Sequence, residues 1–103
     1  MDQSAFEHER REHVRRFSEA YPDRQVQDVG MEVGGYAVGQ QVCARRYNSD
    51  NPVQDIRFSG TIVAFIDMVN EMGDREVQAI IRSVAGVRRV PLGLVEASPE
   101  DEA

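Results

Sequence analysis

The chain has 103 residues, of which 41% are hydrophobic, and a formal net charge of −6 at pH 7. This length fits one domain with a single core, and no apolar run approaches the roughly 20 residues that a membrane-spanning helix needs. The acidic total argues against bulk, non-specific binding of nucleic acid, because such binding requires a positive surface.

The N-terminus and the cysteine content together predict the cellular compartment. Asp2, Glu7 and Glu9 lie close to the first methionine, which is the wrong charge for a secretory signal. Cys43 is the only cysteine of the chain, so it cannot form an internal disulfide, in agreement with a reducing compartment. We therefore expect a soluble cytoplasmic protein.

The twelve basic residues are all arginines, and charge is spread unevenly along the chain. Residues 1–35 hold eight acids and five arginines, residues 36–96 hold seven of each, and residues 97–103 hold three acids. The middle of the chain is therefore neutral overall. Each positive charge there is a planar guanidinium fork, which suits a carboxylate or a phosphate.

Residues 1–24 are predicted to form a helical arm. Ser4 and Glu7 match a capping box at the start of the helix, and a Tyr-Pro-Asp sequence ends it after about Ala20.

The apolar stripe of this helix is thin, since its large members are Phe6, Val14 and Phe17. A stripe of this kind cannot hold a helix deep in a core. We expect the arm to lie against the rest of the molecule or against a second copy. These three residues are therefore the candidates for self-association.

Residues 25–38 fit a short strand or an extended, glycine-containing linker equally well. From residue 39 to residue 96, β-prone runs alternate with turn signals roughly every eight to twelve residues, a spacing typical of short strands. The pattern predicts a mainly β domain, a five-stranded, strongly bent barrel. Residues 97–103 read as a disordered acidic tail.

Three local signals refine this barrel. Ser59 and Gly60 interrupt the long β-run that starts at Ile56, as a bulge or sharp bend does. Pro91 ends the last long strand, and the Leu-Gly-Leu sequence after it suits a 3₁₀ turn. The predicted core consists of Val42, Ala44, Ile56, Phe58, Ile62, Ala64, Val77, Ala79, Ile81, Val90, Leu92 and Leu94.

A competing interpretation treats residues 62–72 and 77–84 as two amphipathic helices, because their apolar residues also fit helical spacing. The β-branched residues in both runs favour strands. Within them, residues 67–72 are the part best suited to a helix.

The order of these runs is similar to that of SH3-like small barrels of the Tudor and KOW kind. The resemblance covers residues 38–96 and depends on pattern. A narrower resemblance is to plasmid-borne type II dihydrofolate reductases, whose Val-Gln-Ile-Tyr-Pro segment surrounds a pore shared by four subunits. This chain has Val87-Arg88-Arg89-Val90-Pro91 instead and lacks that Gln and Tyr. The comparison supports the fold and argues against the activity.

No catalytic or metal-binding constellation, and no cofactor site, stands out in the sequence. His8 and His13 lie too far round a helix to share a face, and no paired-cysteine motif exists. No histidine lies near Cys43 in the sequence, and both histidines belong to the arm.

Arginine is the residue type whose arrangement suggests a binding surface. If the outer faces of the strands adjoin, guanidinium groups lie beside an aromatic ring, which suits a phosphate, a carboxylate or a stacked base. The candidate binding residues are Arg45, Arg46, Tyr47, Arg57, Arg82, Arg88 and Arg89.

These observations predict a non-enzymatic binding or regulatory module that recognises a macromolecular partner and self-associates through the arm. A protein partner is favoured because of the acidic total, nucleic acid stays open, and no membrane contact is expected. The alternatives are a pore enzyme similar to type II dihydrofolate reductase and a structural assembly subunit of a mobile element.

Overall fold

The structure is a computed structural model that describes residues 3–46 and 56–97. Its elements are α1 (Gln3–Ala20), η1 (Pro22–Arg24), β1 (Gln27–Asp28), β2 (Glu32–Val33), β3 (Tyr36–Ala37), β4 (Gln41–Arg46), β5 (Ile56–Val69), β6 (Arg75–Ser83), β7 (Gly86–Pro91), η2 (Leu92–Leu94) and β8 (Val95–Ala97). The prediction of a mainly β protein with one N-terminal helix is confirmed.

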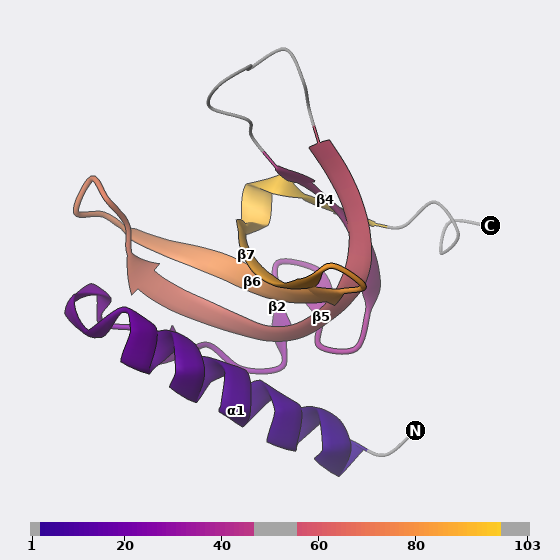
Figure 1. The fold of residues 1–103 in the computed structure, drawn as a ribbon, viewed down its shortest axis with the longest axis horizontal. Helices are drawn as coiled ribbons and strands as arrows, with labels where there is room; N and C mark the ends of the chain where they lie inside the picture. Colours follow the sequence, from indigo (N-terminus) through magenta and orange to yellow (C-terminus); the bar gives the residue numbers. More distant parts are fainter. Residues whose placement is uncertain (1–2, 47–55, 98–103) are drawn as a thin grey trace.

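One antiparallel sheet organises the molecule, with the strand order β7-β6-β5-β4-β8 and β1 added on β5. β2 and β3 form a separate two-stranded hairpin. In Figure 1 the long strand β5 bends strongly, so the sheet curls around η2 while α1 lies across its outer side.

The prediction of a closed five-stranded barrel is wrong. In the part of the chain that the structure describes, β7 pairs only with β6 and β8 only with β4, so the sheet is open, and there are eight strands. Pro91 offers a physical reason for the open edge, since it has no N–H to donate to a neighbouring strand. After Pro91, η2 carries the chain across to β8.

The two helices considered over residues 62–72 and 77–84 do not form, because both segments belong to the sheet as β5 and β6. Between them Asn70 closes a turn, as its side-chain oxygen accepts hydrogen bonds from the N–H groups of Met72 and Asp74 at 2.9 and 3.0 Å. The strand prediction is therefore confirmed, including residues 67–69, which had the strongest helical character.

β5 is buried on both of its faces. Ile62 pairs with Ile81 and Ala64 pairs with Ile80, so Val63 is an extra residue at a β-bulge. The bulge puts Val63 and Ala64 together in the apolar cluster under α1, whereas Ile62 lies in the cluster on the concave face. The bulge therefore lies at Val63 and not at Ser59 and Gly60, where the sequence predicted a bulge or a sharp bend.

Gly60 has a different role from the bulge predicted for it. The glycine lies in a regular stretch opposite Val42, and a Cβ added there would lie 2.6 Å from the carbonyl oxygen of Arg82 and from Ile81 Cγ2. It therefore permits close approach of β6.

The predicted core is partly correct on the concave face, where it omits Phe65 and Val95, and more incomplete on the face that α1 covers. Ala64 is buried but belongs to the helix-side cluster, and Val77 is half-buried. The side chain of Ile56 lies outside the described residues. The buried residues that the prediction omitted are Val63, Phe65, Ile66, Met68, Ile80 and Val95.

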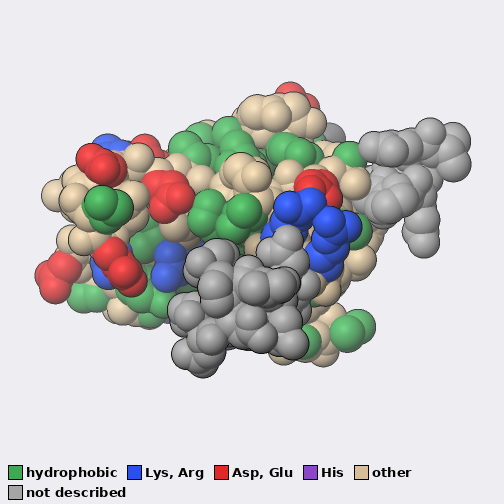
Figure 2. All heavy atoms as spheres, turned by 90° about the horizontal axis from the view of Figure 1, so that it is seen from above, with side chains coloured by type: hydrophobic (Ala, Val, Ile, Leu, Met, Phe, Trp, Pro, Cys, Tyr) green, Lys and Arg blue, Asp and Glu red, His purple; other side chains and the backbone are tan. Residues whose placement is uncertain are grey.

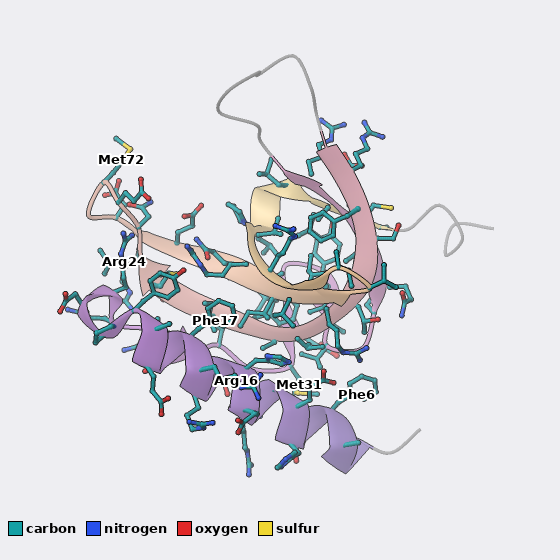
Figure 3. All side chains as sticks on the ribbon, in the orientation of Figure 1. Phe6, Arg16, Phe17, Arg24, Met31 and Met72 are labelled. Atoms are coloured by element: carbon teal, nitrogen blue, oxygen red, sulfur yellow. The ribbon has the colours of Figure 1, made fainter. Side chains whose placement is uncertain are left out.

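α1 covers the convex face of the sheet through the apolar stripe predicted from the sequence. Val14, Phe17 and Tyr21 pack against the helix-side cluster, and Figure 3 shows Phe17 projecting from α1 toward the sheet. The rings of Phe17 and Tyr21 are stacked with their centroids 6.3 Å apart.

Two ion pairs fasten the helix to the strands. Arg10 binds Asp28 of β1, and Arg82 of β6 binds Glu9 with 2.7 Å between Nε and Oε2. We call this contact surface between α1 and the sheet the helix seam.

Candidate binding groove

The open side of the curled sheet contains a groove with a volume of about 620 Å³. Its volume lies within the range of about 300–1,000 Å³ that is usual for ligand sites. We call it the arginine groove. It is lined by Phe17, Tyr21, Arg45, Phe58, Val87, Arg88, Arg89, Val90, Pro91 and Leu94.

The groove exists because the sheet does not close. Residues 87–91 of β7 form one wall, while Arg45 of β4, Phe58 of β5 and Leu94 of η2 contribute from the opposite side of the curl. Phe17 and Tyr21 enter from the C-terminal end of α1. Segments from both ends of the chain therefore meet at one surface.

The lining combines positive charge with aromatic rings. Three arginines and three aromatic residues line the groove, and none of its described lining residues is acidic. Figure 2, which views the molecule from the top of Figure 1, shows basic and hydrophobic side chains close together on this face. Such a surface attracts negatively charged groups.

Arg89 is held in place by neutral groups. Its Nη1 donates a hydrogen bond to Gln78 Oε1 at 2.8 Å and lies 3.3 Å from Met68 Sδ. The guanidinium carbon lies 4.7 Å from the centroid of the Tyr21 ring, in a cation–π contact. Gln78 in turn donates to Glu76 Oε2 at 3.2 Å. These contacts orient the guanidinium group of Arg89 without neutralising its charge.

Neighbouring arginines differ in how their charge is balanced. Within residues 3–46 and 56–97, neither Arg88 nor Arg89 has a carboxylate within ion-pair distance, whereas Arg75 pairs with Asp67 at 3.2 Å. Arg45 is also balanced, as its Nη2 lies 3.2 Å from Glu96 Oε1. The positive charge available in the groove therefore lies mainly on β7.

The structure brings together three of the predicted binding residues, Arg45, Arg88 and Arg89, and places two others elsewhere. Arg57 lies directly opposite Arg45 across the β4–β5 ladder but does not line the groove. Arg82 lies at the helix seam, bound to Glu9. Tyr47 and the side chain of Arg46 lie outside the described residues.

The residues predicted for self-association contact this chain itself. Val14 and Phe17 pack on the helix-side cluster. A Cβ added to Gly39 would lie 3.5 Å from the ring of Phe6, so this ring rests against the turn before β4. Phe17 also lines the groove, where its aromatic ring has a role that sequence reasoning did not assign to it.

Sequence reasoning did not predict that Tyr21 and Phe58 line one site. From the sequence, Tyr21 only marks the end of the helix, and its contact with Arg89 depends on how α1 packs across the sheet. Phe58 is predicted as a core residue. Phe58 is half-buried, and it both packs against the core cluster on the concave face and lines the groove.

Among the described residues, no group of three or more His, Cys, Asp or Glu side chains gathers as a metal site would require. The buried imidazole of His13 lies 3.5 Å from Glu9 at the helix seam. No helix in the described ranges is both long enough and apolar enough to span a bilayer.

Comparison of the chain with protein-family models, with curated proteins and with solved structures gives no match. The resemblance to SH3-like barrels therefore receives no support beyond the small, antiparallel β architecture.

Proposed function

We propose that this protein is a binding module whose arginine groove recognises a carboxylate-rich segment of a partner protein. The observation that carries the proposal is the pair of arginines on β7, Arg88 and Arg89, which line an apolar and aromatic groove and have no carboxylate partner among the described residues.

Charge and shape both favour this class of ligand. Arginine binds carboxylates through two parallel hydrogen bonds, and these bonds strengthen where apolar walls exclude water. Phe58, Val90 and Leu94 supply such walls here. The net charge of −6 opposes long nucleic acids, which would meet acidic surface outside the groove.

The helical arm contributes Phe17 and Tyr21 to the wall of the groove. Self-association through Phe6, Val14 and Phe17 stays a separate prediction, because these side chains already contact the same chain. Sedimentation of the wild type and of a Phe6→Ala variant tests it, since loss of a dimer in the variant would support an interface through the arm.

The test uses the full chain and a fluorescent peptide that contains two glutamates between β-prone residues. We expect Arg88→Gln/Arg89→Gln to weaken binding of this peptide by about tenfold or more, because two charge-assisted contacts are lost. Fluorescence anisotropy at low and high salt measures the effect.

The matched control removes the same charge elsewhere. Arg15 and Arg16 lie on the exposed side of α1, paired with acids of the same helix, so Arg15→Gln/Arg16→Gln lowers the net charge equally outside the groove. Equal weakening by both double variants would mean that total charge governs binding and would overturn the proposal. Preference for a single-stranded oligonucleotide over the peptide would also overturn it.

A further inference from the structure

The mode of binding follows from β7, the strand that forms the wall of the groove. In the described residues β7 pairs only with β6, through a ladder from Gln78 opposite Pro91 to Ser83 opposite Gly86. The far side of the strand carries backbone donors and acceptors that a second strand can use. All residues from Val87 to Pro91 line the groove.

The register shows which backbone groups face the groove. A two-residue turn joins Ser83 to Gly86, so these two residues form a hydrogen-bonded pair, and pairs alternate from there along the antiparallel ladder. Val87 and Arg89 fall at the alternate positions, so their N–H and C=O groups point away from β6. Pro91 falls at the next such position, so its missing N–H removes no hydrogen bond between β7 and β6.

Side chains along β7 alternate between the two faces of the sheet. Arg88 lies opposite Ile81, and Val90 lies opposite Ala79, on the concave face. Arg89 lies opposite Ile80, on the face that α1 covers. Arg88 and Arg89, which have no carboxylate partner among the described residues, therefore extend to opposite faces of the sheet along this edge.

We infer that the groove takes its ligand as a β-strand added to the edge of β7 that faces away from β6, and that two neighbouring acidic residues of this strand contact Arg89 on one face and Arg88 on the other. The inference depends on the proposed function. Consecutive residues of an extended strand point to opposite faces, so an adjacent acidic pair matches the two guanidinium groups. Acids separated by one residue would both lie on the same face.

A second copy of β7 is a poor occupant of this edge. Antiparallel pairing of two β7 strands would bring Arg88 and Arg89 close to the same residues of the other copy, and like charges across strands destabilise a sheet. The same charges attract an acidic strand. The occupant is therefore a segment of another protein.

The test compares two peptides of identical composition bound to the full chain. One carries Glu-Glu between threonine and valine residues, and the other carries Glu-Thr-Glu. We expect the adjacent peptide to bind about tenfold or more tightly than the separated one, since only the adjacent pair reaches both arginines. Methylation of alternate backbone nitrogens in the adjacent peptide should weaken its binding when the methyl groups face β7.

Amide hydrogen exchange provides the second readout. Binding of the adjacent peptide should slow exchange at the N–H groups of Val87 and Arg89 by about tenfold or more, because these groups gain partners. The N–H of Arg88 already pairs with β6 by the alternation, so its exchange should change less.

The outcomes separate this inference from the proposed function. If both peptides bind equally through Arg88 and Arg89 and exchange at Val87 stays unchanged, strand addition is wrong and the acidic-ligand proposal stands. If neither peptide binds, both are wrong. A dimer that forms without peptide and disappears on removal of residues 98–103 would identify the chain's own acidic tail as the occupant and overturn the assignment to a partner protein.

Discussion

The helix seam and the arginine groove lie on the same small sheet and treat their arginines in opposite ways. At the seam, Arg10 and Arg82 each meet a carboxylate from a distant part of the chain. In the groove, Arg88 and Arg89 have none among the described residues, and neutral groups hold Arg89. The contrast separates charge that joins two elements from charge that is available to a ligand.

The two regions also differ in packing, since the helix seam is tightly packed and the arginine groove is partly open. Under the helix, Ile66, Met68 and Ile80 are completely buried. At the groove, Phe58 and Leu94 are only partly covered, and Val87 is 39% exposed. The seam provides stability, and the groove keeps apolar surface accessible.

The largest expected effect comes from opening a cavity at the seam. Ile66→Ala should lower the free energy of unfolding by about 2–5 kcal/mol, because Ile66 is fully buried under α1. Val87→Ala in the groove should change it by about 0.5 kcal/mol or less. Urea denaturation monitored by circular dichroism measures both. Equal losses would contradict the distinction between a sealed and an open region.

A second prediction concerns the close approach of β5 and β6. Gly60→Ala should cost about 1–3 kcal/mol of stability, because the added methyl group meets the backbone of Arg82 and the side chain of Ile81 at 2.6 Å. Gly93→Ala is the matched control, since a Cβ at Gly93 has no heavy atom within 4 Å. If the Gly60→Ala protein unfolds at the same urea concentration as the Gly93→Ala protein, the tight contact is wrong.

A third prediction sharpens the comparison of the arginines themselves. A double-mutant cycle with Glu9→Gln and Arg82→Gln should give a coupling of about 0.2–1 kcal/mol at low salt, reduced at high salt, because the pair is partly exposed. Arg88→Gln should leave stability nearly unchanged, since Arg88 has no such partner in the described chain. A stability loss for Arg88→Gln as large as for Arg82→Gln would mean that Arg88 has a structural role.

The smallest predicted effect involves the exposed side of α1, away from both regions. A hydrogen bond from Arg15 holds the pKa of Glu12 below its ordinary value of 4.5. The charged carboxylate therefore contributes stability above pH 4.5 that is lost as the pH falls through the lowered pKa. Thermal midpoints of the wild type and Glu12→Gln should differ slightly at neutral pH and converge in acid. A constant difference across this range would contradict the assignment.

Local signals predicted much of the fold. Pro91 marked the end of β7, and the Leu-Gly-Leu sequence after it forms η2. Each of these features depends on residues that are close in sequence. Their conformational preferences are therefore visible without knowledge of the rest of the molecule.

The remaining features depend on packing between distant segments. The bulge at Val63 arises because β5 is buried on two faces, and the apolar run alone does not show which residue is extra. Likewise, sequence alone does not distinguish Arg82 from Arg89. The carboxylate that neutralises Arg82 belongs to Glu9, 73 residues away, and the ring beneath Arg89 belongs to Tyr21, which directly follows α1.

We expect the groove arginines, and not the seam arginines, to receive the ligand's carboxylates. The most direct measurement follows the side-chain Nε–Hε signals of the arginines by NMR while the peptide with adjacent glutamates is added to the full chain. The signals of Arg88 and Arg89 should show large, saturable shifts, and the signal of Arg82 should stay unchanged. Shifts at Arg82 with none at Arg88 and Arg89 would contradict this expectation.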